Sequence, residues 1–268
     1  MNDTHEKEKW LEQVKEDGYV LARIPSDERA YDICMEAVMQ RPKVLKFVPE
    51  KHKSLELCTK AVKQNGTVLQ YVPKIIMTYE ICLLAVSNTG KAIRYVPEKF
   101  KSIELCTRAI EKYPFALEYI ADKFKTYDLC KAVVKRSGIC LKFIPRIHLT
   151  YELCMEAVKQ NGMAIIYVPD RYKKYDLYLA ACNSNGLALQ FVPDKHRSVE
   201  ICTVAVNGCK LAKRYVPDRY ITQEPFRSIK DVNVANVVYK IAKNVNIKDI
   251  ISSIPSKYLF SNHKDLTA

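Results

Sequence analysis

The residues of this sequence that could hold a metal or attack a substrate are its ten cysteines and five histidines. Seven cysteines recur at intervals of 24 residues, with Tyr178 in the one missing place: Cys34, Cys58, Cys82, Cys106, Cys130, Cys154 and Cys202. If each interval is one packed unit, equivalent cysteines lie about 10 Å apart, whereas a disulfide needs Cα atoms within about 7 Å. A zinc site needs four converging ligands, usually with closely spaced cysteines, and no Cys-x-x-Cys pair occurs. The sequence therefore predicts small, buried thiols that hold neither a metal nor a cofactor.

The histidines do not suggest a catalytic site. His52, His148 and His196 occupy one position within the 24-residue interval, so they are separated by several copies and cannot meet. No nucleophile, base and orienting acid are brought together by the pattern. We therefore expect a protein that is not an enzyme.

A third kind of chemistry is electrostatic. After most prolines stands a triplet of a basic residue, an aromatic residue or histidine, and a second basic residue. The basic members are Lys51, Lys53, Lys99, Lys101, Lys123, Lys125, Arg171, Lys173, Lys195, Arg197 and Arg219, and the rings are His52, Phe100, Phe124, Tyr172, His196 and Tyr220. Two triplets are largely apolar instead: Ile75, Ile76 and Met77, and Ile147, His148 and Leu149. Because equivalent loops of stacked repeats share one edge, we expect a basic ridge interrupted by two apolar gaps.

The elements that position these residues follow from the prolines. Pro25, Pro49, Pro73, Pro97, Pro145, Pro169, Pro193 and Pro217 keep the same 24-residue interval, with Ala121 in the one missing place. A hydroxyl residue follows most prolines by five positions and an acid by seven, which is typical of a helix N-cap and first turn. The apolar spacing predicts a helix of about ten residues, ended by a glycine, and then a second, shorter helix. Such short helices must stack to bury their apolar faces, so the predicted fold is all-α, an α-solenoid of about nine helix pairs.

The ends of the chain depart from the repeat. We expect residues 1–24 to form an N-terminal capping repeat and residues 25–216 to form eight 24-residue helical repeats. Residues 217–268 are predicted to contain a degenerate repeat and a helical C-terminal cap, with Val234, Val238 and Ile241 on one face.

The composition of the chain indicates which classes of partner and which cellular compartment to expect. The 43 lysines and arginines exceed the 30 acids by +13, which favours an acidic protein or nucleic acid as partner. The chain has no apolar run near eighteen residues and no leader-like start, so neither a membrane span nor secretion is expected. Reduced cysteines in a cytoplasmic protein fit this pattern.

The repeat unit also carries a resemblance. Its residues are the aromatic-Val-Pro that precedes each helix and the stretch Ala-Val-Lys-Gln-Asn-Gly, which occurs at 61–66 and again at 157–162. This unit resembles the short tandem helical repeats of unknown function found in giant DNA viruses of amoebae and in some intracellular bacteria. The resemblance spans about Trp10 to Val216. It implies a viral or effector-like protein that acts in the host cytoplasm or nucleus or in a virion, and it supplies no catalytic residues.

Two functions follow from the basic ridge. The first is an interaction scaffold that docks an acidic protein, such as a virion or host component, through the ridge and its apolar gaps. The alternative is a nucleic-acid binder without sequence preference, in which the ridge cations contact phosphates and Phe100, Phe124 and Tyr172 stack on bases. The rings could equally pack the loops onto their own helices, with the lysines keeping a repetitive protein in solution.

Overall fold

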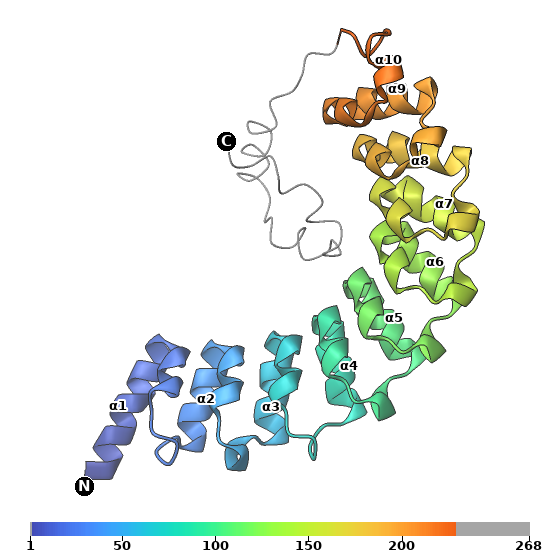
Figure 1. Ribbon diagram of the computed structural model, residues 1–268. Helices are drawn as coiled ribbons and strands as arrows, with labels where there is room; N and C mark the ends of the chain where they lie inside the picture. The colour runs from blue at the N-terminus through green and yellow to red at the C-terminus, as the bar shows by residue number, and fades with distance from the viewer. Residues whose placement is uncertain (1, 229–268) are drawn as a thin grey trace.

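The computed structural model describes residues 2–228, which form a curved stack of short helices (Figure 1). The α-helices are α1 (Asn2–Glu16), α2 (Tyr31–Gln40), α3 (Leu55–Gln64), α4 (Tyr79–Asn88), α5 (Ile103–Lys112), α6 (Tyr127–Arg136), α7 (Tyr151–Gln160), α8 (Tyr175–Ser184), α9 (Val199–Gly208) and α10 (Asp218–Ile221). Helices α2 to α9 each contain ten residues, start 24 residues apart and pack on their neighbours in chain order. No strand occurs among the described residues. The predicted all-α solenoid of 24-residue repeats is confirmed.

The α-helices begin where the hydroxyl residues predict. In six of them the N-cap side chain accepts a hydrogen bond from the backbone N–H three residues later: Ser54, Thr78, Ser102, Thr126, Thr150 and Ser198. This contact satisfies one of the free N–H groups of the first turn. Each helix buries one face; in α3 the buried residues are Leu57, Cys58, Ala61 and Val62. The same four places are buried in every helix from α2 to α9, so the core runs through the whole stack.

The second helix of each repeat is a six-residue 3-10 helix. These are η2 (Pro42–Phe47), η4 (Gly66–Tyr71), η5 (Gly90–Tyr95), η7 (Pro114–Tyr119), η9 (Gly138–Phe143), η11 (Gly162–Tyr167), η13 (Gly186–Phe191) and η15 (Lys210–Tyr215). An X-Pro bond follows each of them except η7, which Ala121 follows, and it keeps the residue before proline out of the helical region. A six-residue segment is too short for stable α-helical turns. The loops after the prolines contain further three-residue 3-10 helices: η3 (Glu50–His52), η6 (Glu98–Phe100), η8 (Asp122–Phe124), η10 (Arg146–His148), η12 (Asp170–Tyr172) and η14 (Asp194–His196).

The glycine that follows α1, α3, α4, α6, α7 and α8 has a different role from the predicted one. No glycine of the described chain has positive φ, and α3 ends at Gln64, before Gly66, so glycine does not end the helix by a left-handed cap. Instead, Gly66 is buried at the start of η4 against the next repeat, where an added Cβ would lie 2.0 Å from the carbonyl oxygen of Ala85. The glycine is required for close approach of two backbones.

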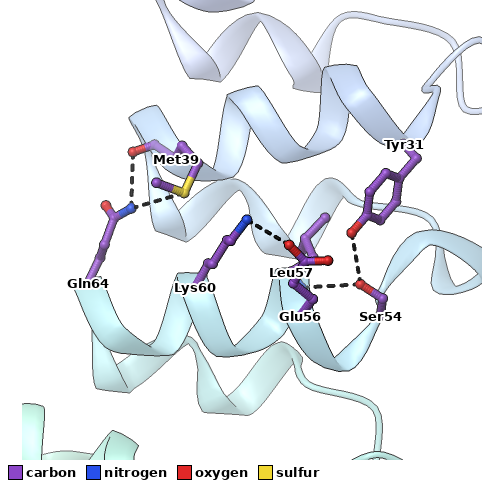
Figure 2. Close-up of polar contacts among 7 residues, drawn as sticks. All are labelled: Tyr31, Met39, Ser54, Glu56, Leu57, Lys60 and Gln64. Atoms are coloured by element: carbon purple, nitrogen blue, oxygen red, sulfur yellow. Dashed lines mark hydrogen bonds and ion pairs between the residues drawn. The ribbon is translucent and has the colours of Figure 1, made fainter.

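Polar side chains join each α-helix to the next. Figure 2 shows the pair α2 and α3, where the hydroxyls of Tyr31 and Ser54 are 3.1 Å apart and Gln64 Nε2 donates to the carbonyl of Met39 at 3.2 Å. Ser54 also caps α3 by accepting from the N–H of Leu57 at 3.2 Å. Equivalent tyrosines contact the first-turn acid of the following helix; the hydroxyl of Tyr79, for example, donates to Glu104 at 3.0 Å. These contacts fix the register between repeats.

The first repeat is built from α1 and a five-residue 3-10 helix, η1 (Gly18–Ala22). Trp10 stands 24 residues before Cys34 and is half-buried, and its indole N–H donates to Glu28 at 3.1 Å. After the last full repeat, α10 contains four residues. The predicted C-terminal cap with Val234 and Ile241 lies outside the described residues.

Candidate binding surfaces

The loops that carry the predicted basic ridge lie along the outer, convex edge of the arc (Figure 1). The inner edge is formed by the ends of the α-helices and the beginnings of the six-residue 3-10 helices (Figure 1). Each loop presents its residues in a fixed way, because a proline and a short 3-10 turn precede the next α-helix. Equivalent loop residues therefore form rows along the convex edge.

The second basic residue of each triplet is largely withdrawn from solvent. The side chains of Lys53, Lys101 and Lys125 are only 8–9% exposed. Lys101 Nζ donates to Glu98 at 2.6 Å and to the carbonyl of Tyr119, at the end of η7 in the same repeat, at 3.0 Å. The second basic residues that bond to a loop acid or to a backbone carbonyl are Lys53, Lys101, Lys125, Lys173 and Arg197. Three of them, Lys101, Lys125 and Arg197, tie the loop to the six-residue 3-10 helix that ends 18 residues later.

The acid that opens each loop belongs to the same contact. Lys173 lies 2.9 Å from Asp170, and this hydrogen bond lowers the pKa of the Asp170 carboxyl below its ordinary value. A loop of the common type therefore carries an acid, an exposed cation and a largely buried cation. Its net charge is about half of what the triplets alone suggest.

In the loops of the two apolar gaps, other residues stand where the common loops carry the acid and the largely buried cation. In the loop 74–77, Met77 takes the place of the buried lysine and is 8% exposed, while Lys74 takes the place of the acid. In the loop 146–149, Leu149 is buried in the same way and Arg146 replaces the acid. An unpaired buried acid or cation would be costly, so the two positions change together. Of the five apolar gap residues, Met77 and Leu149 are core and Ile76 is half-buried.

The middle residue of each triplet packs inward. Phe100, Phe124, Tyr172 and Tyr220 are half-buried and lie against the hydrophobic core. The rings of His52, His148 and His196 are also half-buried and lie 6.2, 6.4 and 5.4 Å from tyrosine rings of a preceding α-helix. Cations of the same loops sit over four of these rings; Lys99 Nζ, for example, is 4.7 Å from the centre of Phe100. The rings are therefore packed and covered.

Of each triplet, the convex edge exposes mainly the first residue, which lies beside the exposed acid that opens each common loop. We call this set the exposed row: Lys51, Ile75, Lys99, Lys123, Ile147, Arg171, Lys195 and Arg219. Ile75 and Ile147 are 93% and 85% exposed, more than any other large hydrophobic residue in the described part of the chain. A cleft of about 310 Å³ lies beside the second of them, lined by Arg146, Leu149, Tyr167, Pro169 and Arg171. Arg219 is paired with Asp194 at 2.8 Å.

The cysteines lie in the core. Nine are buried and Cys209 is partly exposed. Burial raises the pKa of the Cys106 thiol to about 11 and that of Cys182 to about 12. Within residues 2–228, no group of three histidine, cysteine or acidic side chains is placed to hold a metal ion.

A second charged surface, which the sequence analysis missed, lies on the six-residue 3-10 helices. Lys46, Arg94, Lys142 and Arg214 each stand next to the aromatic residue that precedes Val-Pro or Ile-Pro and lie over its ring, at 4.5–6.0 Å. Arg94 lies between two rings, 5.1 Å from Tyr95 and 5.2 Å from Tyr119. Lys46, Arg94 and Lys142 are 48 residues apart, which is a double period of two 24-residue repeats. This spacing was the sequence signal that could have revealed the surface.

Comparison with known proteins gives one match. Residues 31–77, 78–125 and 126–173 each match the sequence model of a domain of unknown function, DUF4116. Each segment covers two of the 24-residue repeats, which accounts for the double period. No curated protein and no solved structure matches the chain. No helix in the described part of the chain is long and apolar enough to cross a membrane.

Proposed function

The chain belongs to the DUF4116 family of domains of unknown function, and we propose that it is a non-enzymatic interaction scaffold that docks an acidic protein or assembly partner along the exposed row. The observation that carries the proposal is the exposure of Ile75 and Ile147 within a row of cations. Both isoleucines stand in loops whose opening acid has been replaced by a cation. A partner with apolar side chains among carboxylates complements this row.

In the loops 74–77 and 146–149, the apolar residues are of two kinds, buried and exposed. Met77 and Leu149 fill buried places, so their apolar character is explained by the core. Ile75 and Ile147 contact little of the chain, and an isoleucine in water gains nothing from its exposure. Exposed apolar residues ringed by cations are typical of a docking surface.

The proposal is non-enzymatic for two reasons. The thiols are buried and have raised pKa values, which makes them poor nucleophiles at neutral pH. His52, His148 and His196 each pack against a tyrosine in a separate repeat. If the chain has the viral or effector-like role that its resemblance implies, the partner is a virion or host component.

The test is affinity purification from host-cell lysate with the parent chain and two matched variants, I75S/I147S and L55S/I103S. Leu55 and Ile103 are 49% and 56% exposed and begin α-helices, so their change removes similar apolar surface elsewhere. We expect acidic proteins that stay bound to the parent and to L55S/I103S at about 0.5 M salt, where surface charge is largely screened. These proteins should be lost with I75S/I147S, and equal retention by all three chains would refute the docking role of the isoleucines.

DNA-binding measurements test the alternative function, a nucleic-acid binder without sequence preference. Along the exposed row, labelled single-stranded and duplex DNA should bind weakly at physiological salt, because only one cation of each common triplet is exposed. Tight binding that falls steeply with salt and is abolished by K51Q/K99Q/K123Q would instead support nucleic-acid binding along the exposed row.

A further inference from the structure

A cleft on the six-residue 3-10 helices lies apart from the exposed row. It has a volume of about 310 Å³ and is lined by residues of η2, η4 and η5: Lys43, Thr67, Gln70, Tyr71, Lys91, Arg94 and Tyr95. Three of the lining residues are cations, two are tyrosines and none is an acid. The volume lies at the lower end of the range of ligand sites in proteins.

The cations of this cleft are available to a ligand. Lys43 and Lys91 are exposed and form no ion pair among the described residues. The Arg94 guanidinium is held between the rings of Tyr95 and Tyr119, which restrict its position and leave its N–H donors without an acidic partner in the same part of the chain. Three positive charges in one cleft repel one another, and an anion between them would relieve that repulsion.

Polar neighbours complete the lining. Gln70 Nε2 donates to the carbonyl of Thr67 at 3.1 Å, and the Thr67 hydroxyl donates to Asn65 at 2.7 Å. The Gln70 amide and the Thr67 hydroxyl oxygen are thus fixed by the protein itself. The rings of Tyr71 and Tyr95 are half-buried, and both residues line the same cleft.

The two lysines are a local feature and not a general device for solubility. Later repeats carry apolar residues where Lys43 and Lys91 stand: Phe115, Ile139, Met163, Leu187 and Leu211. Lys43 and Lys91 are 48 residues apart, so they occupy the same place in two consecutive units of the family match. A cation recurs at the position of Arg94 in Lys46, Lys142 and Arg214, but only the cleft repeats combine it with the two lysines.

We propose that this cleft binds a nucleotide, with its phosphates on Lys43, Lys91 and Arg94 and its base against the tyrosines. Phosphate oxygens accept charge-assisted hydrogen bonds from lysine and arginine, and an aromatic ring stacks on any base at a gain of about 1–3 kcal/mol. The nucleotide is either free or one unit of a single strand, since both offer phosphate and base together. The site shares no residue with the exposed row, so it does not rest on the docking function proposed above.

The experiment measures fluorescence anisotropy of two probes at 0.15 M salt: mant-ATP, and fluorescein-labelled octathymidylate. The variants are K43Q/K91Q and the matched control K135Q/K159Q, which removes two exposed lysines of α6 and α7, outside both the cleft and the exposed row. All four lysines are exposed, so both variants should retain the parent's melting temperature. We expect at least one probe to bind, K43Q/K91Q to weaken its binding about tenfold, and K135Q/K159Q to change it less than twofold.

The outcomes distinguish a free nucleotide from a nucleotide that is part of a single strand. Binding of mant-ATP identifies a free nucleotide, and binding of octathymidylate alone identifies a strand. Lack of binding by both probes, or equal weakening by the two variants, would overturn the proposal. Inorganic tripolyphosphate that competes as well as unlabelled ATP would show that the base makes no contact and would overturn the assignment of a nucleotide.

Discussion

At the scale of single residues, the spacing between repeats depends on glycines, which lack a Cβ atom. In η4, η5, η9, η11 and η13 the first residue is a glycine whose missing Cβ would lie 2.0–2.3 Å from a carbonyl oxygen of the next α-helix. Pro42 and Pro114 take this place in η2 and η7, and η7 packs less closely on α6 than η5 packs on α5. Glycine thus permits the closest contact between repeats.

Replacing Gly162 by alanine should destabilise the stack. The new Cβ would lie 2.2 Å from the carbonyl oxygen of Ala181, so α8 must move away from η11, at a cost of about 1–3 kcal/mol for overpacking. Gly208 provides the control, because a Cβ there comes no nearer than 4.0 Å to Cys182 and alanine favours the helix by up to about 1 kcal/mol. Thermal unfolding followed by circular dichroism should give a lower melting temperature for G162A and an unchanged or higher one for G208A. A G162A chain as stable as the parent would contradict the close approach.

At the scale of elements, the N-caps explain where the α-helices begin, and two of them, Ala30 of α2 and Lys174 of α8, supply no side-chain cap. Lys174 stands at the N-cap of α8 and makes no capping hydrogen bond, whereas Ser198 caps α9 with a bond of 3.2 Å to the N–H of Ile201. The backbone of both residues is extended, as a cap requires.

Serine at position 174 should therefore stabilise α8. Lys174 is exposed, so K174S removes no buried contact. The N–H of Leu177, from which a serine would accept, already donates to Asp176 at 3.0 Å, so we expect a gain below the usual value of about 1 kcal/mol. The change S198A removes a capping bond and should cost about 1 kcal/mol. Hydrogen exchange of the amides of α8 and α9 measures both effects locally, and slower exchange in α8 is expected for K174S. Unchanged exchange in α8 would show that Asp176 already satisfies the first turn.

The sequence predicted the elements better than their contacts. The hydroxyl, acid and apolar series carry helix boundaries directly, so α2 to α9 were predictable to within a residue or two. The 3-10 geometry was not, because a six-residue apolar segment before proline fits either kind of helix. The inward position of Lys101 and Lys125 was also missed, since their partners are backbone carbonyls 18 residues away, which a sequence does not display. The concerted change of Glu98 to Lys74 and of Lys101 to Met77 between repeats was the signal that could have shown it.

At the scale of the whole molecule, the repeats share one core, and their small contributions add along the stack. The two surfaces lie on different elements: the loops of the exposed row follow the convex edge (Figure 1), whereas the cleft is lined by residues of three neighbouring 3-10 helices. The nine buried thiols are distributed along the same core from Cys34 to Cys202. They couple the stability of the whole stack to pH.

Stability should fall as pH rises through the range 9 to 11. The folded chain keeps a thiol such as that of Cys106 protonated because burial raises its pKa from 9.0 to about 11, whereas the unfolded chain ionises it near 9. Above pH 9 the folded state thus binds more protons than the unfolded state, and each such thiol removes about 1.4 kcal/mol of stability by pH 10. Melting temperatures at pH 8, 9 and 10 should drop less steeply for C58A/C106A/C154A than for the parent, whatever their values at pH 8. The control C209A alters a partly exposed cysteine and should keep the parent's slope. Parallel curves for the parent and the triple variant would show instead that lysines and tyrosines cause the alkaline loss, and that the thiols ionise without unfolding the stack.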